Sequence, residues 1–345
     1  MKHTIYICIF FLCSCANVIA PSGGPKDTEA PRLLETIPKN NTCSFNQSNI
    51  IFVFDENIEI NEINNILISP YTTNSPKINV NKNKLKLEFE EKLFPNTTYL
   101  LSLDDVIKDV NEGNTLNKLN YKLSTGVKID SLTISGTVMD AKTSEPLSGV
   151  WIGLYKNNSD SVLYQETPKY ITKSSKHGVF SFSNLPEESF YIYAIEDLDN
   201  NLKFSIPNEK IGFYNEKVLS QTEDIEIRLF DETAVADSVK EISIDSLTNS
   251  FGKLIIDSLP KKPLIVELIK GGNIIYRKNG SNNMSIDSLT TGNYSLRFIE
   301  DKNQNGIWDS GNLINKITPE KVTLYPKEIN IRENWDVIVE WQPNL

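Results

Sequence analysis

The stretch KLKLEFE, residues 84–90, alternates charged and apolar side chains at every position. Leu85, Leu87 and Phe89 fall on one side of an extended chain and the charged residues fall on the other, because successive side chains of a β-strand point to opposite faces. One face of this segment is therefore expected to be buried and the other to be wet. The pattern predicts a strand whose sheet covers a hydrophobic core on one side.

Short strands and turns of the same kind surround this stretch. Ile51 to Phe54 form an uninterrupted apolar run that predicts a buried strand, and Pro95-Asn96 and Glu112-Gly113-Asn114 supply turn residues. No long amphipathic helical pattern interrupts the series. Strands of this length and spacing predict an antiparallel β-sandwich, and the whole chain is expected to be all-β.

The chain also contains an internal repeat. Residues 180–204, FSFSNLPEESFYIYAIEDLDNNLKF, align without a gap on residues 284–308, MSIDSLTTGNYSLRFIEDKNQNGIW. Two related β-sandwich modules are therefore expected after the first, at residues 130–230 and 251–345, with an acidic linker at residues 231–250. Three tandem β-sandwich modules are a common way to build tethers and recognition stalks.

The N-terminus has the features of an export signal. A short positive segment precedes an apolar run from Ile5 to Leu12, which is far shorter than the roughly 20 residues of a membrane-spanning helix. The run ends in Leu12-Cys13-Ser14-Cys15, the pattern of a bacterial lipobox, in which the peptidase cuts before the cysteine and lipid is attached to it. Residues 1–14 are interpreted as a signal peptide, and Cys15 as the acylated first residue that anchors the mature chain to a membrane.

The segment after the lipobox is expected to be a flexible tether. Residues 15–29 are rich in proline, glycine and small side chains and show no helical or strand periodicity. Cleavage before Cys15 leaves Cys43 as the only other cysteine, so no disulfide is expected within the mature chain. Cys43 is interpreted as a small buried apolar residue rather than as a reactive thiol.

Several segments in order resemble a family of Bacteroidota lipoproteins that carry an N-terminal bacterial Ig-like domain. They are PSGGPKD after the cysteine, then IIFVFDENI, LFPNTTYLLSL, DVNEGNTL and YKLSTG. The resemblance covers about residues 27–126 and implies an Ig-like module at residues 30–126. It also implies an outer-membrane lipoprotein. No acidic cluster follows Cys15, as it does in the surface-export signals of that group, so the periplasmic face is expected rather than the cell surface.

The segment from Leu132 resembles another family, the carboxypeptidase regulatory-like, transthyretin-like β-sandwich. In this family a strand with the motif Gly-x-Val-x-Asp is followed by the motif Pro-Leu-x-Gly-Val. The positions of this chain that match the two motifs are Gly136, Val138, Asp140, Pro146, Leu147, Gly149 and Val150. The usual Asp-Gly turn is His177-Gly178 here, and its glycine still permits the positive φ of a tight hairpin. Such modules accompany peptidases without cutting peptides, so this resemblance implies a fold and not an activity.

The net charge and the histidine content argue against several classes of function. A net charge of −10 argues against nucleic acid as a partner. A catalytic triad, a multi-histidine zinc site or a histidine base would have to rest on His177, the single histidine of the mature chain. The paired acids Asp104-Asp105 are interpreted as solvated groups at a strand end rather than as a glycosidase pair. The chain is therefore expected to be no enzyme and to require no cofactor.

The tripeptide Asp-Ser-apolar recurs six times, where a chain of this composition would give about one or two by chance. It resembles the O-glycan acceptor motif of exported Bacteroidota proteins, in which the serine is the attachment point. The alternative is an Asp-Ser turn that opens a strand, and both interpretations stay open. The candidate serines are Ser131, Ser161, Ser238, Ser246, Ser258 and Ser288.

The segment DKNQNGIWD, residues 301–309, has the spacing of a calcium-binding loop. Oxygen ligands at alternate positions around a glycine turn are what a hard cation requires. The candidate ligands are Asp301, Asn303, Asn305, the carbonyl of Ile307 and Asp309, with Gly306 at the turn. Asn312 stands where an EF-hand has its bidentate glutamate, so calcium is expected to bind weakly, with a dissociation constant of roughly 10⁻⁴ to 10⁻³ M.

Two further observations bear on the prediction that this loop binds calcium. Asn305-Gly306 is by itself a strong turn signal, so a plain hairpin loop is the alternative interpretation. The repeat partner, Asp197-Leu198-Asp199-Asn200-Asn201, lacks the glycine and the final aspartate, which makes the second copy a weaker candidate.

Three tryptophans, Trp308, Trp335 and Trp341, lie close together in the last module. Packing in the core is their expected role, and a platform for sugar stacking is the alternative. The chain is interpreted as a non-enzymatic, lipid-anchored envelope protein that acts as a structural or binding element, with an unidentified envelope protein or glycan as its partner. The alternative is a carbohydrate-binding or carbohydrate-processing envelope protein, which an exposed row of these tryptophans would favour.

Overall fold

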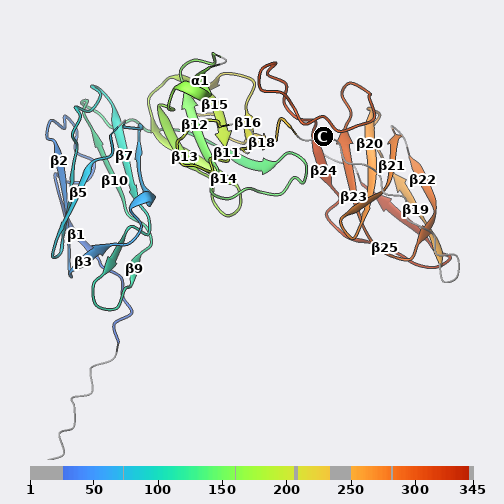
Figure 1. Ribbon diagram of the computed structural model, residues 1–345, viewed down its shortest axis with the longest axis horizontal. Coiled ribbons are helices and arrows are strands. Elements are labelled where there is room, and N and C mark those ends of the chain that lie inside the picture. The colour runs from blue at the N-terminus through green and yellow to red at the C-terminus, as the bar shows by residue number, and fades with distance from the viewer. Residues whose placement is uncertain are drawn as a thin grey trace, which may run out of the picture.

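The computed structural model describes residues 26–72, 74–159, 161–205, 209–233, 250–280 and 283–341. The signal peptide, Cys15, most of the tether, and the linker serines Ser238 and Ser246 lie outside these residues. The described chain is almost entirely β, as the sequence predicts, with one short helix α1 (Val162–Gln165) and one 3-10 turn η1 (Ile63–Asn65). None of its helices is long and apolar enough to cross a membrane. Three β-sandwiches follow one another along an arc (Figure 1).

The first sandwich contains two facing sheets and a small third one. Its strands are β1 (Leu33–Ile37), β2 (Asn49–Phe54), β3 (Ile58–Ile60), β4 (Ile66–Ser69), β5 (Lys77–Asn81), β6 (Lys84–Glu88), β7 (Thr98–Leu103), β8 (Ile107–Asp109), β9 (Thr115–Leu116) and β10 (Asn120–Ser124). The sheet orders are β1-β2-β6-β5, β10-β7-β4 and β3-β8-β9. Leu85 and Leu87 are fully buried between the sheets while Lys84 is exposed, as the alternation at residues 84–90 predicts.

The second and third sandwiches have the same architecture, strand for strand. The second contains β11 (Leu132–Asp140), β12 (Trp151–Tyr155), β13 (Tyr170–Lys173), β14 (Val179–Leu185), β15 (Ser189–Ile195), β16 (Ile211–Phe213), β17 (Val218–Leu219) and β18 (Ile225–Leu229). The third contains β19 (Phe251–Asp257), β20 (Leu264–Lys270), β21 (Asn273–Gly280), β22 (Met284–Thr290), β23 (Gly292–Glu300), β24 (Val322–Leu324), β25 (Ile329–Ile331) and β26 (Asp336–Glu340). Their sheets run β14-β11-β18 with β13-β12-β15-β16, and β22-β19-β26 with β21-β20-β23-β24.

One pairing in these two modules differs from an antiparallel sandwich. The first and last strands of each module lie side by side and run in the same direction, β11 with β18 and β19 with β26. Gly136 permits this contact, because a Cβ at this position would lie 2.1 Å from the carbonyl oxygen of Ile225. A larger residue would therefore push the two parallel strands apart.

The second and third sandwiches share a hydrophobic cluster, named here the junction cluster. Its members come from both modules and are Ala141, Tyr155, Val162, Leu163, Tyr193, Ile195, Phe204, Ile211, Phe213, Phe230, Ile265, Ile299, Trp308, Leu313 and Val322. Polar contacts cross the same boundary: the Ser144 hydroxyl donates to the Val322 carbonyl at 2.6 Å, and the Leu313 N–H donates to the Glu232 carboxylate at 2.8 Å. The two modules are therefore packed against each other.

A buried ionic group lies beside this boundary. Glu267 of β20 is fully buried, and its carboxylate accepts hydrogen bonds from the guanidinium groups of Arg277 and Arg297 at 2.7 and 2.6 Å. Arg297 also donates to the carbonyl of Lys142 in the second module at 3.4 Å. Because a buried carboxylate needs compensating charge, the two arginines explain how Glu267 is tolerated there.

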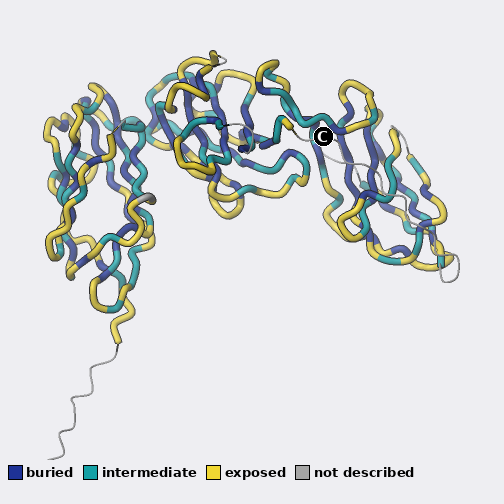
Figure 2. Tube along the Cα trace, viewed as in Figure 1, coloured by how far each residue is buried: buried dark blue, intermediate teal, exposed yellow. Residues whose placement is uncertain are grey.

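The contact between the first and second sandwiches is of a different kind. The first module's cluster of buried apolar residues contains residues of that module alone. Hydrogen bonds join the two modules, from the Tyr71 N–H to the Lys169 carbonyl at 2.8 Å and from the Thr98 hydroxyl to Asp130 at 2.9 Å. Figure 2 shows the buried residues concentrated inside each sandwich. Among the described residues, the first junction thus lacks the shared cluster of buried apolar side chains that the second junction has.

The structure corrects the prediction for Cys43. This residue lies between β1 and β2 and is exposed, whereas the sequence analysis placed it in the interior. The neighbouring Phe45 is the residue of this segment that enters the core, with an exposed fraction of 6%. Turn geometry, which residue type alone does not reveal, therefore decides which side chain points inward.

Candidate metal centre

The loop at residues 301–309 closes around the carboxylate of Asp301. This side chain is 2% exposed, and its two oxygens accept the N–H groups of Asn305 at 3.1 Å and of Gly306 at 3.0 Å. Gly306 has φ +78°, a left-handed conformation that glycine adopts easily. The loop belongs to the long connection between β23 and β24, which pair as antiparallel neighbours, so it joins two hydrogen-bonded strands as the hairpin interpretation expects.

Three more of the predicted ligands gather at this loop. The Asn303 and Asn305 side-chain amides both donate to the Asp309 carboxylate, at 2.6 and 3.0 Å. The Ile307 N–H donates to the Asn305 side-chain oxygen at 2.8 Å, which fixes the orientation of that amide. The structure therefore brings Asp301, Asn303, Asn305 and Asp309 together.

Glu320 is an additional acidic group at this site that the sequence analysis missed. It is 4% exposed, and its carboxylate accepts the N–H of Lys302 at 2.8 Å and that of Asp309 at 3.2 Å. Burial raises the pKa of Glu320, and the nearby carboxylates of Asp309 and Asp301 raise it further. A cation among these three acids would offset both effects.

The internal repeat contained the signal for Glu320. The segments EKIGFY at residue 209 and EKVTLY at residue 320 correspond in the two modules, so a glutamate recurs behind each loop, 12 residues after Asp197 and 19 residues after Asp301. An EF-hand places its last ligand within the loop, at position 12, where this chain has Asn312. Here the additional carboxylate comes from the segment just before β24.

The second module repeats this arrangement around Asp197. Its carboxylate accepts the N–H groups of Asn201 at 3.2 Å and of Leu202 at 2.8 Å. Glu209 is 5% exposed and accepts the N–H groups of Leu198 at 3.0 Å and of Ser205 at 2.5 Å. Ligand oxygens of Asp197, Asp199 and Glu209 all lie within 4.8 Å of one another. The second loop therefore presents a three-carboxylate cluster of its own.

The missing glycine does not change the conformation of the second loop. Leu202 occupies the position of Gly306 and adopts the same left-handed backbone, with φ 57°. This loop was predicted to be the weaker copy because it lacks both the glycine and the final aspartate, and only the first of these differences concerns the backbone. The hydrogen bonds to Asp197 and Glu209 show that the chain accepts a strained leucine there and keeps the loop closed.

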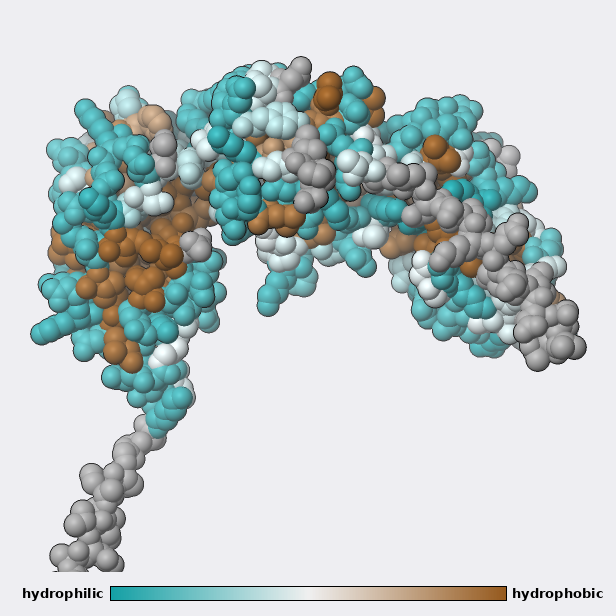
Figure 3. Space-filling view, in the orientation of Figure 1, coloured by the Kyte–Doolittle hydropathy of each residue, from teal (hydrophilic) through white to brown (hydrophobic). Residues whose placement is uncertain are grey.

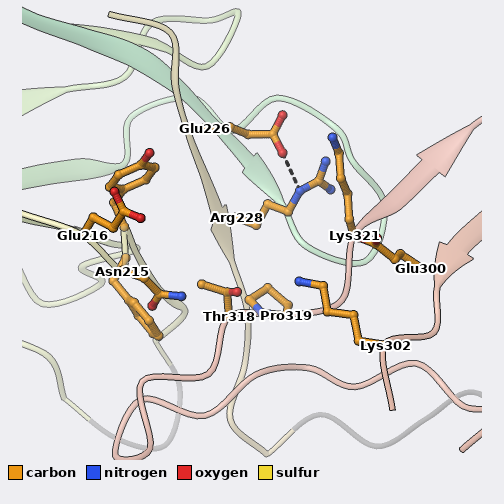
Figure 4. Close-up of a pocket in the computed structure, with 11 residues that line it drawn as sticks. Asn215, Glu216, Glu226, Arg228, Glu300, Lys302, Thr318, Pro319 and Lys321 are labelled. Carbon is orange, nitrogen blue, oxygen red and sulfur yellow. Dashed lines mark hydrogen bonds and ion pairs between the residues drawn. The ribbon is translucent and has the colours of Figure 1, made fainter. Parts of the chain in front are cut away.

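The third-module loop packs into the boundary with the second module. Trp308 follows the glycine turn, is 7% exposed and belongs to the junction cluster, and its indole N–H donates to the Glu320 carbonyl at 3.1 Å. A cavity of about 320 Å³ opens beside the loop between the two modules. Figure 4 shows Lys302 reaching into it from the loop, opposite the ion pair in which Arg228 donates to Glu226 at 2.7 Å.

The tryptophans of the last module do not form an exposed row. Trp308 lies in the junction cluster, and Trp341 packs against Phe298 and Tyr325 with ring centroids 4.9 and 5.3 Å apart. Only Trp335 is largely exposed, at 62%. Core packing is thus the role of two of the three, and the feature that most favoured a sugar platform in this module is absent.

The four Asp-Ser serines within the described residues are all exposed: Ser131, Ser161, Ser258 and Ser288. Ser131 directly precedes β11, as expected for a turn that opens a strand. The others do not fit that interpretation, because Ser161 precedes α1, Ser258 follows β19 and Ser288 lies within β22. Each of the four is accessible to a modifying enzyme.

Comparison with known families identifies the first module. Residues 27–125 match the model of the bacterial Ig-like domain, which agrees with the fold of the first sandwich. No match was found among curated protein sequences.

Solved structures with some likeness include the minor pilin of Streptococcus agalactiae, at 15% identity and a TM-score of 0.19, covering 61% of this chain and 95% of the pilin. The major pilin subunit of Bacillus cereus has 12% identity and a TM-score of 0.19, covering 58% of this chain and 71% of that one. The N-terminal part of the bacterial S-layer protein SbsC has 10% identity and a TM-score of 0.21, covering 57% of this chain and 45% of that one.

Proposed function

We propose that this chain is a non-enzymatic, lipid-anchored protein of the bacterial envelope that acts as a structural or binding element through its β-sandwich modules. The observation that carries the proposal is the junction cluster, which packs the second and third modules into one arm. The first module, which is joined to this arm by hydrogen bonds, and the tether then connect the arm to the anchor. Such a chain can hold a binding surface at a distance from the membrane.

The lipobox and the resemblance to Bacteroidota lipoproteins support an anchor on Cys15 in the outer membrane, facing the periplasm. The test is acyl labelling and membrane fractionation of cells that express Cys15→Ala. Loss of the acyl label and release of the chain from the membrane are expected, while Cys43→Ala keeps both because the exposed Cys43 lies in the first module. A Cys15→Ala chain that still incorporates lipid contradicts the anchor.

The partner is an envelope protein or glycan that contacts the module surfaces. Chemical crosslinking in intact cells, followed by mass spectrometry, tests this role. Crosslinks from lysines of the second and third modules to one recurrent envelope component are expected. Turnover of a defined envelope substrate by the purified chain contradicts a non-enzymatic role.

We further propose that calcium binds the third-module loop. Support comes from the ligand spacing of the loop and from its closed conformation, in which Asp309 accepts the side-chain amides of Asn303 and Asn305 and Glu320 accepts the Asp309 N–H. Hard cations prefer such oxygen ligands. Thermal melting of the full chain in millimolar calcium and in chelator tests the proposal: calcium is expected to raise the melting temperature, and an unchanged melting temperature contradicts it.

O-linked glycans on the Asp-Ser serines form a separate part of the proposal. Its support is the exposure of all four described serines and the poor fit of three of them to the turn interpretation. The intact mass of the exported chain is expected to exceed that of the lipidated polypeptide. A mass equal to that of the bare lipidated chain contradicts glycosylation.

A further inference from the structure

Trp151, the first residue of β12, lies at the junction between the first and second modules. It is partly exposed, and the Lys173 ammonium lies 4.2 Å from the centroid of its ring. An aromatic ring of this kind has an apolar face and a polar edge, so it suits ligands that also combine both characters. Its position between two modules places it where ligand sites often form.

Two neighbouring cavities meet at this tryptophan. One has a volume of about 460 Å³ and the other about 300 Å³. Both are lined by Asn65, Leu67, Trp151 and Lys173. The two cavities thus adjoin at these four residues and are named here, taken together, the Trp151 groove. Its volume lies in the range of roughly 300–1,000 Å³ that ligand sites occupy. Apolar surface gathers on the first module where it approaches the second (Figure 3).

The two halves of the Trp151 groove differ in character. The larger half is mostly apolar, with Ile63, Ile66, Ile68, Tyr71, Ile78 and Ile171 in its lining. The smaller half is polar, with Ser102, Asp104, Asp105, Asn120 and Thr172. The acids Asp104-Asp105, which the sequence analysis interpreted as solvated, thus lie in a groove that also contains a tryptophan.

The charges of the groove argue against a strongly charged ligand. Lys173 is the only basic residue in the lining of either half, and the acids Asp104 and Asp105 also line the smaller half. The other polar groups are amides and hydroxyls, which both donate and accept hydrogen bonds. A ligand with many hydroxyl groups and apolar C–H faces matches this combination.

We propose that the Trp151 groove binds a neutral oligosaccharide, with a sugar ring against Trp151 and its hydroxyl groups hydrogen-bonded to Asn65, Asp104 and Asn120. This site is distinct from the tryptophans of the third module that the sequence analysis considered for sugar stacking. It goes beyond the structural role proposed above and is independent of the membrane anchor and of calcium, so its failure would leave both intact.

The test is a titration of the full chain, kept in a detergent without a sugar headgroup, with neutral hexasaccharides of glucose, mannose and N-acetylglucosamine. Binding of at least one of them with a dissociation constant below about 1 mM is expected from calorimetry. Trp151→Ala is expected to weaken that affinity at least tenfold, and Asp104→Asn three- to tenfold. Trp335→Ala, which removes the exposed tryptophan of the third module, is the matched control and is expected to leave the affinity unchanged.

Any of three results would overturn the proposal. The first is that none of the three hexasaccharides binds with a dissociation constant below about 1 mM. The second is that Trp335→Ala weakens binding as much as Trp151→Ala, which places the sugar in the third module. Displacement of the bound sugar by an unrelated extended peptide at the same concentration also counts against it, because the groove would then be a peptide site. Unchanged melting temperatures of the variants show that they are folded.

Discussion

The two loops that follow β15 and β23 close with the same backbone hydrogen bonds, although seven of their nine aligned side chains differ. Each closes around an aspartate, the half-buried Asp197 or the buried Asp301, and each receives a buried glutamate from the next segment. Among the positions that differ, the second-module loop has Asp199, Leu202 and Ser205 where the third-module loop has Asn303, Gly306 and Asp309. The Asp–Glu pair that both loops share is therefore sufficient to close them, and the glycine is dispensable.

The largest expected effect concerns the aromatic residue that ends each loop. Trp308→Ala is expected to destabilise the third module by about 3–5 kcal/mol, because it removes a side chain that is 7% exposed and packed between two modules. Phe204→Ala at the matching position is expected to cost a similar amount within the second module. Calorimetric unfolding of the full chain measures both losses. Trp308→Ala with an unchanged transition would show that the loop does not contribute to the junction.

A smaller change in stability is expected from substitutions at the position where one loop has Gly306 and the other has Leu202. Gly306→Ala is expected to cost about 1–2 kcal/mol, because the residue has φ +78° and an added Cβ would meet the Asn279 side chain at 3.0 Å. Leu202→Gly relieves the same strain but loses a half-buried side chain and is expected to stay within about 1 kcal/mol of the parent. Denaturation midpoints of the pair give the comparison. An equal loss of stability in Gly306→Ala and Leu202→Gly would mean that the backbone of Leu202 is not strained.

The third effect is a pH dependence that distinguishes Glu320 from an ordinary glutamate. Its pKa is raised in the folded chain, so the folded state holds this proton more tightly than the unfolded state does. The usual pKa of a glutamate side chain is about 4.3. When calcium is removed by a chelator, the free energy of unfolding of the parent is therefore expected to fall relative to that of Glu320→Gln as the pH rises above this value. Millimolar calcium is expected to cancel this fall. Melting curves from pH 4 to pH 7 provide the measurement, and parallel curves for parent and variant would contradict it.

The smallest effect tests whether the second loop can be converted. Ser205→Asp restores the carboxylate that Asp309 supplies in the third module, and more ligand charge favours calcium. A several-fold increase in calcium affinity of the second-module loop is expected, measured in an Asp301→Ala background that silences the other loop. Glu216→Asp, at an exposed position in the same module, is the control.

The sequence predicted the strands and the module order because both depend on local patterns. The alternation at Lys84 to Glu90 and the gapless repeat were sufficient for the all-β fold and for two matching sandwiches. The parallel pairing of β11 with β18 was not predictable in the same way, because it joins segments about ninety residues apart through a close approach at Gly136.

The candidate metal centre was predictable in part for a similar reason. Asp301, Asn303, Asn305 and Asp309 lie at fixed spacing within one loop, so a local motif revealed them. Glu320 lies beyond the loop, and only its recurrence as Glu209 in the repeat could have indicated it. The Trp151 groove depends on the packing of two modules, and no local pattern records that contact.

We propose that the buried Asp301–Glu320 pair at the junction of the second and third modules holds a calcium ion. Its most direct test is calorimetric titration of the full chain with calcium, beside Asp301→Ala, Asp197→Ala and the exposed-site control Asp336→Ala. The account predicts a site with a dissociation constant of roughly 10⁻⁴ to 10⁻³ M that disappears in Asp301→Ala and remains in Asp336→Ala. No binding at millimolar calcium, or the same affinity in Asp301→Ala, would contradict it.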